Sequence, residues 1–308
     1  MMIPDLGQIF GAGVMSLEAS GMQSAWQSHS RRWKGNHFVY AVISRRSRGI
    51  SIGINLNPNK VCNFNCIYCQ VDRRKAPSVR SVNLERLARE LDLIIAAEQD
   101  GSLYEAAPFN AINSEERGIR DIAFSGDGEP TTFARFAEAV RIAASARIRN
   151  QLLSAKLVLL TNAGGLASSE VQEGLALLDR NNGEIWAKLD AGTEEYFRLL
   201  NRAHIPLATV VDNILQAART YRVVIQSLWL RVRGNPPHQE EIEAYCGILN
   251  GILARGGHLQ RLQIYTIARG PVEFYAAPLS QEELGRIAAI VRAKVPVPAE
   301  IYFGVVPG

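Results

Sequence analysis

Three cysteines lie within eight positions of one another, in the run Cys62-Asn63-Phe64-Asn65-Cys66-Ile67-Tyr68-Cys69. Their spacing is C-x3-C-x2-C, and three thiolates on one short loop are a soft, anionic ligand set that suits zinc or an iron–sulfur cluster. A structural zinc site normally takes a fourth ligand from a second Cys/His pair. The fourth cysteine, Cys246, stands alone, and the five histidines show no ligand spacing. Three ligands on a four-iron cluster would leave one iron open to a substrate or cofactor.

The elements that must position this loop follow a repeating strand–helix order. Residues 50–57 alternate apolar and polar side chains, which predicts a strand that runs directly into the cysteines. Further strands are predicted at 121–126, 156–162, 184–190, 223–232 and 259–268, with a final one at 300–304. Helical patterns lie between them, and Asn83 and Ser280 are placed to cap two of the helices.

About six βα units predict an α/β fold with parallel strands and right-handed crossovers. A doubly wound open sheet and a partial or complete (β/α) barrel both fit this pattern. We expect one domain over residues 48–308 and an N-terminal extension over 1–47, with a short helix around 16–29. In either architecture the loops after the strands form the active site.

Glycines and a carboxylate follow the second of these strands, in Ser125-Gly126-Asp127-Gly128-Glu129. Gly126 and Gly128 would let backbone approach a ligand closely, and Glu129 offers a carboxylate to a cationic group. The alternative is an Asp-Gly turn that only leads into a helix. Asn162, at the end of the next strand, has an amide that suits a ribose or a carboxylate.

The strand EIWAKLD at 184–190 places Trp186, Lys188 and Asp190 on one face and apolar side chains on the other. If the apolar face packs on helices, Lys188 and Asp190 point into the interior of the barrel near its catalytic end. Buried charges need a partner or a polar ligand. We therefore regard both as catalytic candidates; the alternatives are a helix cap for Asp190 and a structural ion pair for Lys188. Tyr265 and Arg269, on the sixth strand, are weaker candidates.

The charge of the chain is unevenly distributed. Residues 1–80 hold eleven Lys/Arg and three Asp/Glu, a net charge of +8, whereas the whole chain carries +4. The basic residues within 31–80 can attract phosphates, of RNA or of a small anion, or can form an ordinary solvated surface. No apolar stretch is long enough to cross a bilayer, and closely spaced free cysteines favour a reducing compartment, so we expect a cytoplasmic protein.

The cysteine run resembles the hallmark of the radical S-adenosylmethionine (SAM) superfamily, C-x3-C-x-aromatic-C, with Tyr68 in the aromatic place. The resemblance implies a radical SAM (β/α) barrel in which Cys62, Cys66 and Cys69 hold a [4Fe–4S] cluster. SAM would chelate the open iron and be cleaved reductively to a 5′-deoxyadenosyl radical, with adenine packed beside Tyr68 and the amino group bound around Gly126, Gly128 and Glu129. Such an oxidoreductase needs a low-potential electron donor of the flavodoxin or ferredoxin type.

The order of motifs is similar to that of the wyosine-synthase-like Fe–S oxidoreductase branch. It runs SRR at 44–46, SIGINLNPNKVCNFNCIYCQ, FSGDGEPT, KLDAG and QIYTIAR, across roughly residues 40–305. True wyosine synthases carry a second cysteine triplet for a second cluster, and this sequence has none. The substrate therefore stays open between tRNA or other RNA, a peptide and a small metabolite. The alternative from another class is a non-catalytic, metal-stabilised RNA-binding protein.

Overall fold

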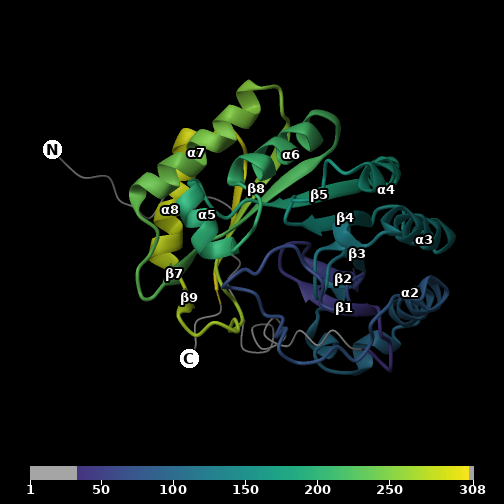
Figure 1. Ribbon diagram of the computed structural model, residues 1–308. Helices are drawn as coiled ribbons and strands as arrows, with labels where there is room; N and C mark the ends of the chain where they lie inside the picture. Colours follow the sequence, from purple (N-terminus) through teal and green to yellow (C-terminus); the bar gives the residue numbers. More distant parts are fainter. Residues whose placement is uncertain (1–32, 305–308) are drawn as a thin grey trace.

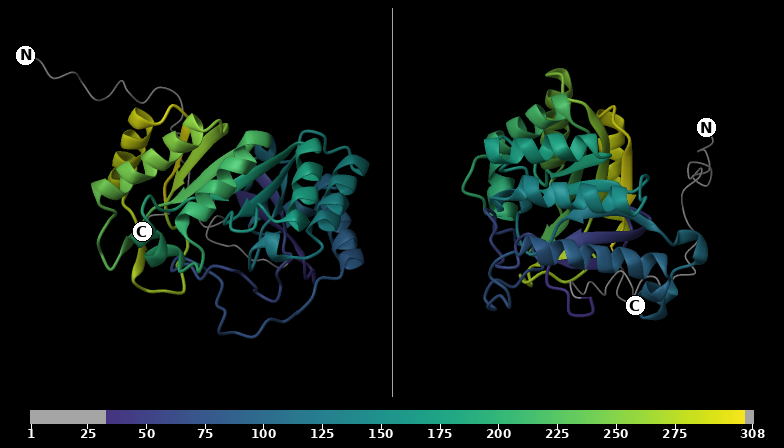
Figure 2. Two further views of the ribbon diagram at one scale, coloured as in Figure 1. Left: turned by 45° about the horizontal axis from the view of Figure 1, so that its top comes forward. Right: turned by 90° about the vertical axis from the view of Figure 1, so that its right-hand side faces the viewer.

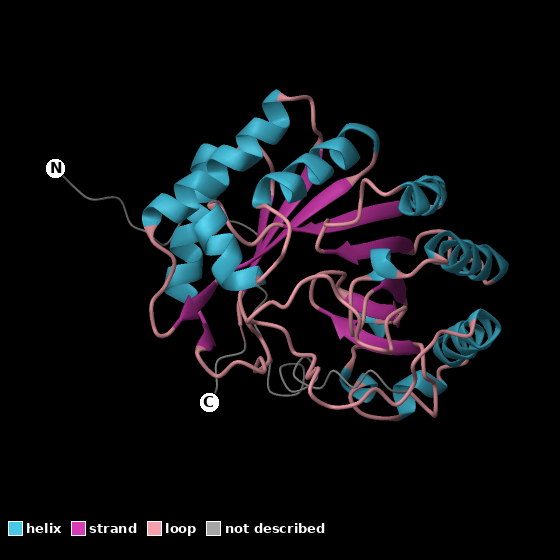
Figure 3. Ribbon diagram, in the orientation of Figure 1, coloured by secondary structure: helices cyan, strands magenta, loops and turns pink. Residues whose placement is uncertain are grey.

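The computed structural model describes residues 33–304, which form a curved sheet covered by helices on its convex side (Figure 1). Coloured by secondary structure, the strands form the inner layer and the helices the outer one (Figure 3). Viewed from the right-hand side of Figure 1, the helices lie stacked in front of the strands (Figure 2).

Eight strands form the main sheet in the order β1-β2-β3-β4-β5-β6-β8-β10. Seven of them run parallel, from β2 to β10, and β1 pairs antiparallel with β2 at one edge. The strands of this sheet are β1 (Val39–Ser44), β2 (Gly49–Ile54), β3 (Ile119–Phe124), β4 (Lys156–Thr161), β5 (Gly183–Lys188), β6 (Val223–Leu228), β8 (Leu259–Tyr265) and β10 (Ala299–Tyr302). Because β1 and β10 do not pair with each other, the barrel is partial, which confirms the predicted fold class.

The helices between the strands are α2 (Leu84–Gln99), α3 (Phe136–Arg149), α4 (Ser169–Arg180), α5 (Glu194–Asn201), α6 (Leu207–Thr220), α7 (Gln239–Ala254) and α8 (Gln281–Lys294). Short 3₁₀ turns lie at Ser102–Glu105, Phe109–Ala111, Ser114–Glu116 and Pro130–Thr132, and β7 (Leu230–Val232) pairs with β9 (Ala276–Pro278) as a separate ribbon. None of the helices in residues 33–304 combines the length and apolarity that a bilayer crossing needs.

Local sequence signals explain several helix starts. The Asn83 side chain accepts a hydrogen bond from the backbone N–H of Arg86, and Ser280 and Glu283 form a reciprocal capping box, both as predicted. The helix α4 begins at Ser169 without a side-chain cap.

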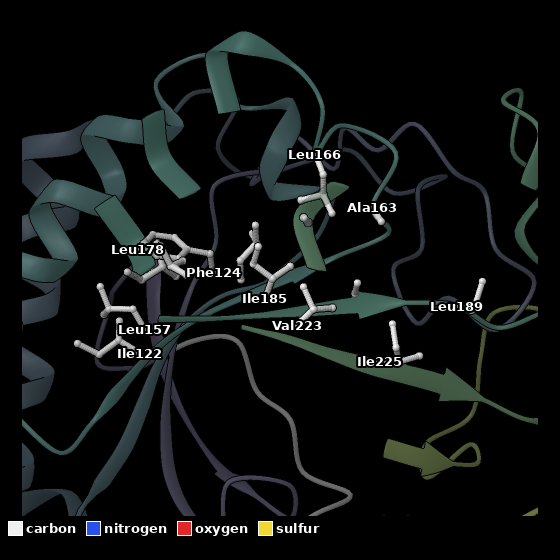
Figure 4. Close-up of a cluster of buried hydrophobic side chains, with 14 of the residues drawn as sticks. Ile122, Phe124, Leu157, Ala163, Leu166, Leu178, Ile185, Leu189, Val223 and Ile225 are labelled. Atoms are coloured by element: carbon white, nitrogen blue, oxygen red, sulfur yellow. The ribbon is translucent and has the colours of Figure 1, made fainter. Parts of the chain in front are cut away.

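The first strand lies inside the segment that we expected to be an extension. Residues 39–44 pair with 49–54 through a tight turn, so the sheet begins before residue 48. The predicted helix at 16–29 lies outside the described residues. Apolar side chains on the helix-facing side of the strands, among them Ile122, Phe124, Leu157, Ile185 and Val223, form the main core (Figure 4).

Candidate active site

A cavity of about 310 Å³ lies on the concave side of the sheet, bounded by the loops that follow β2, β3 and β4. Its size falls at the lower end of the range for small-molecule sites. Most of the predicted site residues line it: Cys62, Cys66, Tyr68, Cys69, Gly126, Gly128, Glu129, Asn162, Lys188 and Arg269. Asp190 and Tyr265 are not among the lining residues, but both contact Lys188.

The cysteine loop is anchored to the C-terminal end of α5. The backbone N–H of Asn65 donates to the carbonyl of Asn201 (3.1 Å), and that of Ile67 donates to Leu200 (2.9 Å). The rings of Phe64 and Phe197 pack edge to face with their centroids 5.7 Å apart. No local pattern in the sequence connects these two segments, which are more than 130 positions apart.

Each cysteine sulfur has an N–H donor near it. The Nδ2 of Asn201 lies 3.5 Å from the Sγ of Cys66, and the Nη1 of Arg73 lies 3.4 Å from that of Cys69. The Nδ2 of Asn162 lies 3.9 Å from the Sγ of Cys62.

Burial acts against ionisation of two of these thiols. It raises the pKa of Cys62 and raises the pKa of Cys66 to about 12. Without a metal these thiols are therefore protonated, and metal binding must displace their protons. The three N–H donors favour the thiolate form that a metal requires.

Three cysteine thiols on one loop have the chemistry of an iron–sulfur ligand set. Within residues 33–304, no group of three Cys, His, Asp or Glu side chains is arranged to hold one metal ion. Ligands of one zinc ion converge because each Zn–S bond is only about 2.3 Å long. The ligands of a four-iron cluster bind different irons and need not converge on one point, so this finding does not test a cluster.

The glycines after β3 are required by close packing against the cysteine loop. A Cβ atom on Gly128 would overlap the carbonyl oxygen of Val61, and one on Gly126 would overlap the Asn55 side chain. The backbone N–H of Glu129 donates to the same Val61 carbonyl, at 3.2 Å. The loops after β2 and β3 therefore form one wall of the cavity.

The Glu129 carboxylate is buried and ties two loops together. It accepts hydrogen bonds from the hydroxyls of Thr131 (2.8 Å) and Thr161 (2.6 Å) and from the backbone N–H of Asn162 (2.8 Å). Burial raises its pKa, and the bond from Asn162 is the largest opposing effect. These contacts join the loop after β3 to the end of β4. They do not test whether Glu129 binds a cationic ligand, so that role remains a prediction.

Lys188 and Asp190 point into the interior side of the sheet, and the structure pairs them. The Nζ of Lys188 lies 3.3 Å from a carboxylate oxygen of Asp190 and 2.9 Å from the hydroxyl of Tyr265. Burial alone would lower the pKa of Lys188, but the charges of Asp190 and Tyr265 outweigh it and raise the pKa. Lys188 is thus held between Asp190 and Tyr265, and its ion pair with Asp190 favours the ammonium form.

Asp190 organises the region below the cysteine loop. It accepts hydrogen bonds from the backbone N–H of Leu228 (2.8 Å), from the hydroxyl of Tyr68 and from Asn201 (3.4 Å). It does not cap α5, because Thr193 does so. The structure therefore shows the ion pair that we considered for Lys188 but not the helix cap that we considered for Asp190.

Comparison with known proteins gives distant relatives. No protein-family model matches the chain. A UPF0026 protein of Helicobacter pylori is 26% identical over 250 residues, which cover 80% of this chain and 71% of that protein. GTPase Obg of Brachyspira hyodysenteriae is 23% identical over 268 residues, but the chain spans only 35% of its length.

Among solved structures, spore photoproduct lyase complexed with dinucleoside spore photoproduct aligns with a TM-score of 0.55 and 11% identity, over 86% of this chain and 79% of that one. SuiB of Streptococcus suis, bound to S-adenosylmethionine, aligns with a TM-score of 0.50 and 10% identity, over 84% of this chain and 49% of that one. The chain therefore shares the partial-barrel fold of these two proteins. This confirms the fold that the resemblance in the sequence implies.

Proposed function

We propose that the chain is a radical SAM enzyme in which Cys62, Cys66 and Cys69 hold one [4Fe–4S] cluster and SAM binds beside it. The observation that best supports this is the meeting of all three cysteines and the Gly126–Glu129 loop at one cavity. When bound, the cluster would supply the electron that cleaves the carbon–sulfur bond of SAM.

The residues around the cavity would prepare it for these groups. Asn201 and Arg73 donate N–H groups toward sulfur, which favours thiolates and lowers the cost of adding an electron. Glu129 fixes the loop after β3, so that its backbone can bind the polar groups of SAM. Tyr68, held by Asp190, offers an aromatic face beside the cysteines.

The chain would take its electron from a low-potential donor of the flavodoxin or ferredoxin type, and it would work in the reducing cytoplasm. We place it in the wyosine-synthase-like branch. The given sequence has four cysteines, too few for the second triplet of true wyosine synthases, so the substrate stays open between RNA, a peptide and a small metabolite.

Anaerobic reconstitution with iron and sulfide, followed by SAM and dithionite, tests this function. We expect a brown protein that forms 5′-deoxyadenosine, and a Cys62→Ala variant that forms none. A colourless, zinc-loaded protein that ignores SAM and binds RNA would overturn the proposal in favour of a metal-stabilised RNA-binding protein.

A further inference from the structure

Aromatic rings and cations alternate along the inner side of the barrel, starting at the cysteine loop. The Nζ of Lys188 lies 4.8 Å from the ring centre of Tyr68 and 5.5 Å from that of Tyr265. The guanidinium carbon of Arg46 lies 5.2 Å from the ring centre of Tyr265 and 5.7 Å from that of Trp186. These contacts join the turn between β1 and β2 to the cysteine loop through one row of side chains.

The cations at the two ends of this row are neutralised. Lys188 pairs with Asp190, and Arg261, whose guanidinium lies 6.0 Å from the Trp186 ring, donates to Glu184 at 2.7 Å. Buried charges are normally paired in this way, because an unpaired charge is costly to remove from water.

Arg46, in the middle of the row, differs from Lys188 and Arg261 because it has no carboxylate partner among the described residues. It lines the cavity and is partly buried. Its recorded contacts among residues 33–304 are the two aromatic faces, and they include neither a hydrogen bond nor an ion pair. Contact with the faces of two rings positions the guanidinium, and its N–H groups, which make no hydrogen bond in the part of the chain that the structure describes, can bind a ligand.

The surroundings of Arg46 favour an anion. The neighbouring Arg45 also lines the cavity, and its charge adds to the local positive potential. Asp121, on β3, also lines the cavity, and the charge of Arg46 acts to lower its pKa; its carboxylate accepts a hydrogen bond from Ser51 and forms no ion pair with Arg46 within residues 33–304.

We propose that Arg46 binds an oxyanion of the substrate, a carboxylate or a phosphate, through its bidentate N–H edge. This inference rests on the proposed function for the reaction that follows, but the anion site can be tested without it. Arg46 would hold the charged end of the substrate on the β1–β2 side of the cavity, and the rest of the molecule would extend toward the cysteine loop.

Binding of inorganic phosphate and of acetate to the reconstituted full-length protein, measured by calorimetry, tests the proposal. Arg46→Gln should weaken binding of the preferred anion by at least about tenfold, because a bidentate charged contact is lost. Arg48→Gln is the matched control, since Arg48 lies on the same turn but is exposed and does not line the cavity. Phosphate or acetate, whichever binds more tightly, identifies the oxyanion.

The same titration is repeated with saturating SAM, which itself carries a carboxylate. Anion binding that persists supports a substrate site, whereas displacement by SAM would assign Arg46 to the cofactor and overturn the proposal. Equal binding by Arg46→Gln and the unmodified protein would also overturn it. Failure of the proposed function would appear separately, as absence of 5′-deoxyadenosine, with the Arg46-dependent binding unchanged.

Discussion

The two faces of the main sheet differ in chemistry although they belong to the same strands. On β5, Ile185 and Ala187 face the helices and join the apolar core, whereas Trp186 and Lys188 face the concave side. The outer face is built from aliphatic and aromatic side chains. The inner face carries charged and amide groups that bind one another through hydrogen bonds and ion pairs.

On each strand, the side chains that stabilise the fold and the side chains that form the site lie mainly on opposite faces. Apolar burial on the outer face drives folding, at about 25 cal/mol per Å² of apolar surface. The inner polar groups gain little net stability from their contacts, because removing charges from water offsets the gain. Substitutions on the outer face should therefore have the larger effect on the free energy of unfolding, whereas substitutions of the inner polar groups should change it less and should mainly affect binding and turnover.

The largest effect should come from the cysteines. Replacing Cys62, Cys66 or Cys69 by Ala should abolish the cluster and all cleavage of SAM, because a cluster left with two protein ligands is not retained. Iron and sulfide analysis after anaerobic reconstitution measures the loss. Cys246→Ala is the control, since Cys246 is buried in α7 away from the cavity and should keep full iron content. Retention of a complete cluster by any of the three variants would contradict the assignment.

Truncating an outer-face side chain should cost the most stability. Phe124 is fully buried and packs edge to face on Phe136, with ring centroids 5.6 Å apart. Phe124→Ala should lower the free energy of unfolding by about 3–5 kcal/mol, measured by urea denaturation. Leu93→Ala, at an exposed position of α2, should change it by less than about 0.5 kcal/mol. A small loss for Phe124→Ala would show that the outer face does not dominate folding.

Glu129→Gln should weaken SAM binding by about tenfold, the equivalent of one charge-assisted hydrogen bond. The amide keeps the shape of the side chain but puts an N–H₂ group where Thr161 and Asn162 donate to the carboxylate. Equilibrium dialysis with labelled SAM measures the change, and Glu138→Gln on the exposed side of α3 serves as the control. Unchanged SAM binding would mean that the loop after β3 does not need the Glu129 carboxylate to bind SAM.

The smallest effect concerns a charge on the inner face. Asp121 is buried, and one of its carboxylate oxygens has no hydrogen-bond partner within the described part of the chain. Burial raises its pKa, against opposing hydrogen bonds from Ser47 and Ser51 and the charge of Arg46. Asp121→Asn should therefore stabilise the protein by about 1 kcal/mol at neutral pH.

The sign of the pH dependence follows from the raised pKa. Protonated Asp121 favours folding below its unfolded pKa of about 3.9, and this advantage is lost as the pH rises through the folded pKa. The stability gap between Asp121→Asn and the unmodified protein should thus widen from about pH 4 to pH 7. Asp92→Asn, on the exposed side of α2, should show no comparable trend. A difference in unfolding free energy that does not change with pH would show that the buried charge of Asp121 does not destabilise the protein.

Local patterns predicted much of this architecture. The alternation in 184–190 correctly assigned Trp186 and Lys188 to the inner face, because side chains on a strand alternate by geometry. The cysteines and the glycines after β3 were placed on loops that follow strands, and these loops line one cavity because the ends of parallel strands meet at one edge. The strand at 39–44 was missed, although an apolar run, a turn and a second apolar run are typical of a hairpin.

The residues that the sequence did not reveal act across long separations. Asn201 reaches Cys66 only because α5 packs against the cysteine loop, and nothing around position 201 marks it as a sulfur partner. Arg46 was visible as one of several basic residues. Its position between Tyr265 and Trp186 depends on the curvature of the sheet, which no local pattern encodes.

The central claim is that three thiols hold an iron–sulfur cluster whose open corner accepts SAM. Electron paramagnetic resonance of the reconstituted, dithionite-reduced protein tests it most directly. A reduced [4Fe–4S] signal that changes shape when SAM is added is the predicted result. A protein without such a signal, or with a signal that SAM leaves unchanged, would contradict the account.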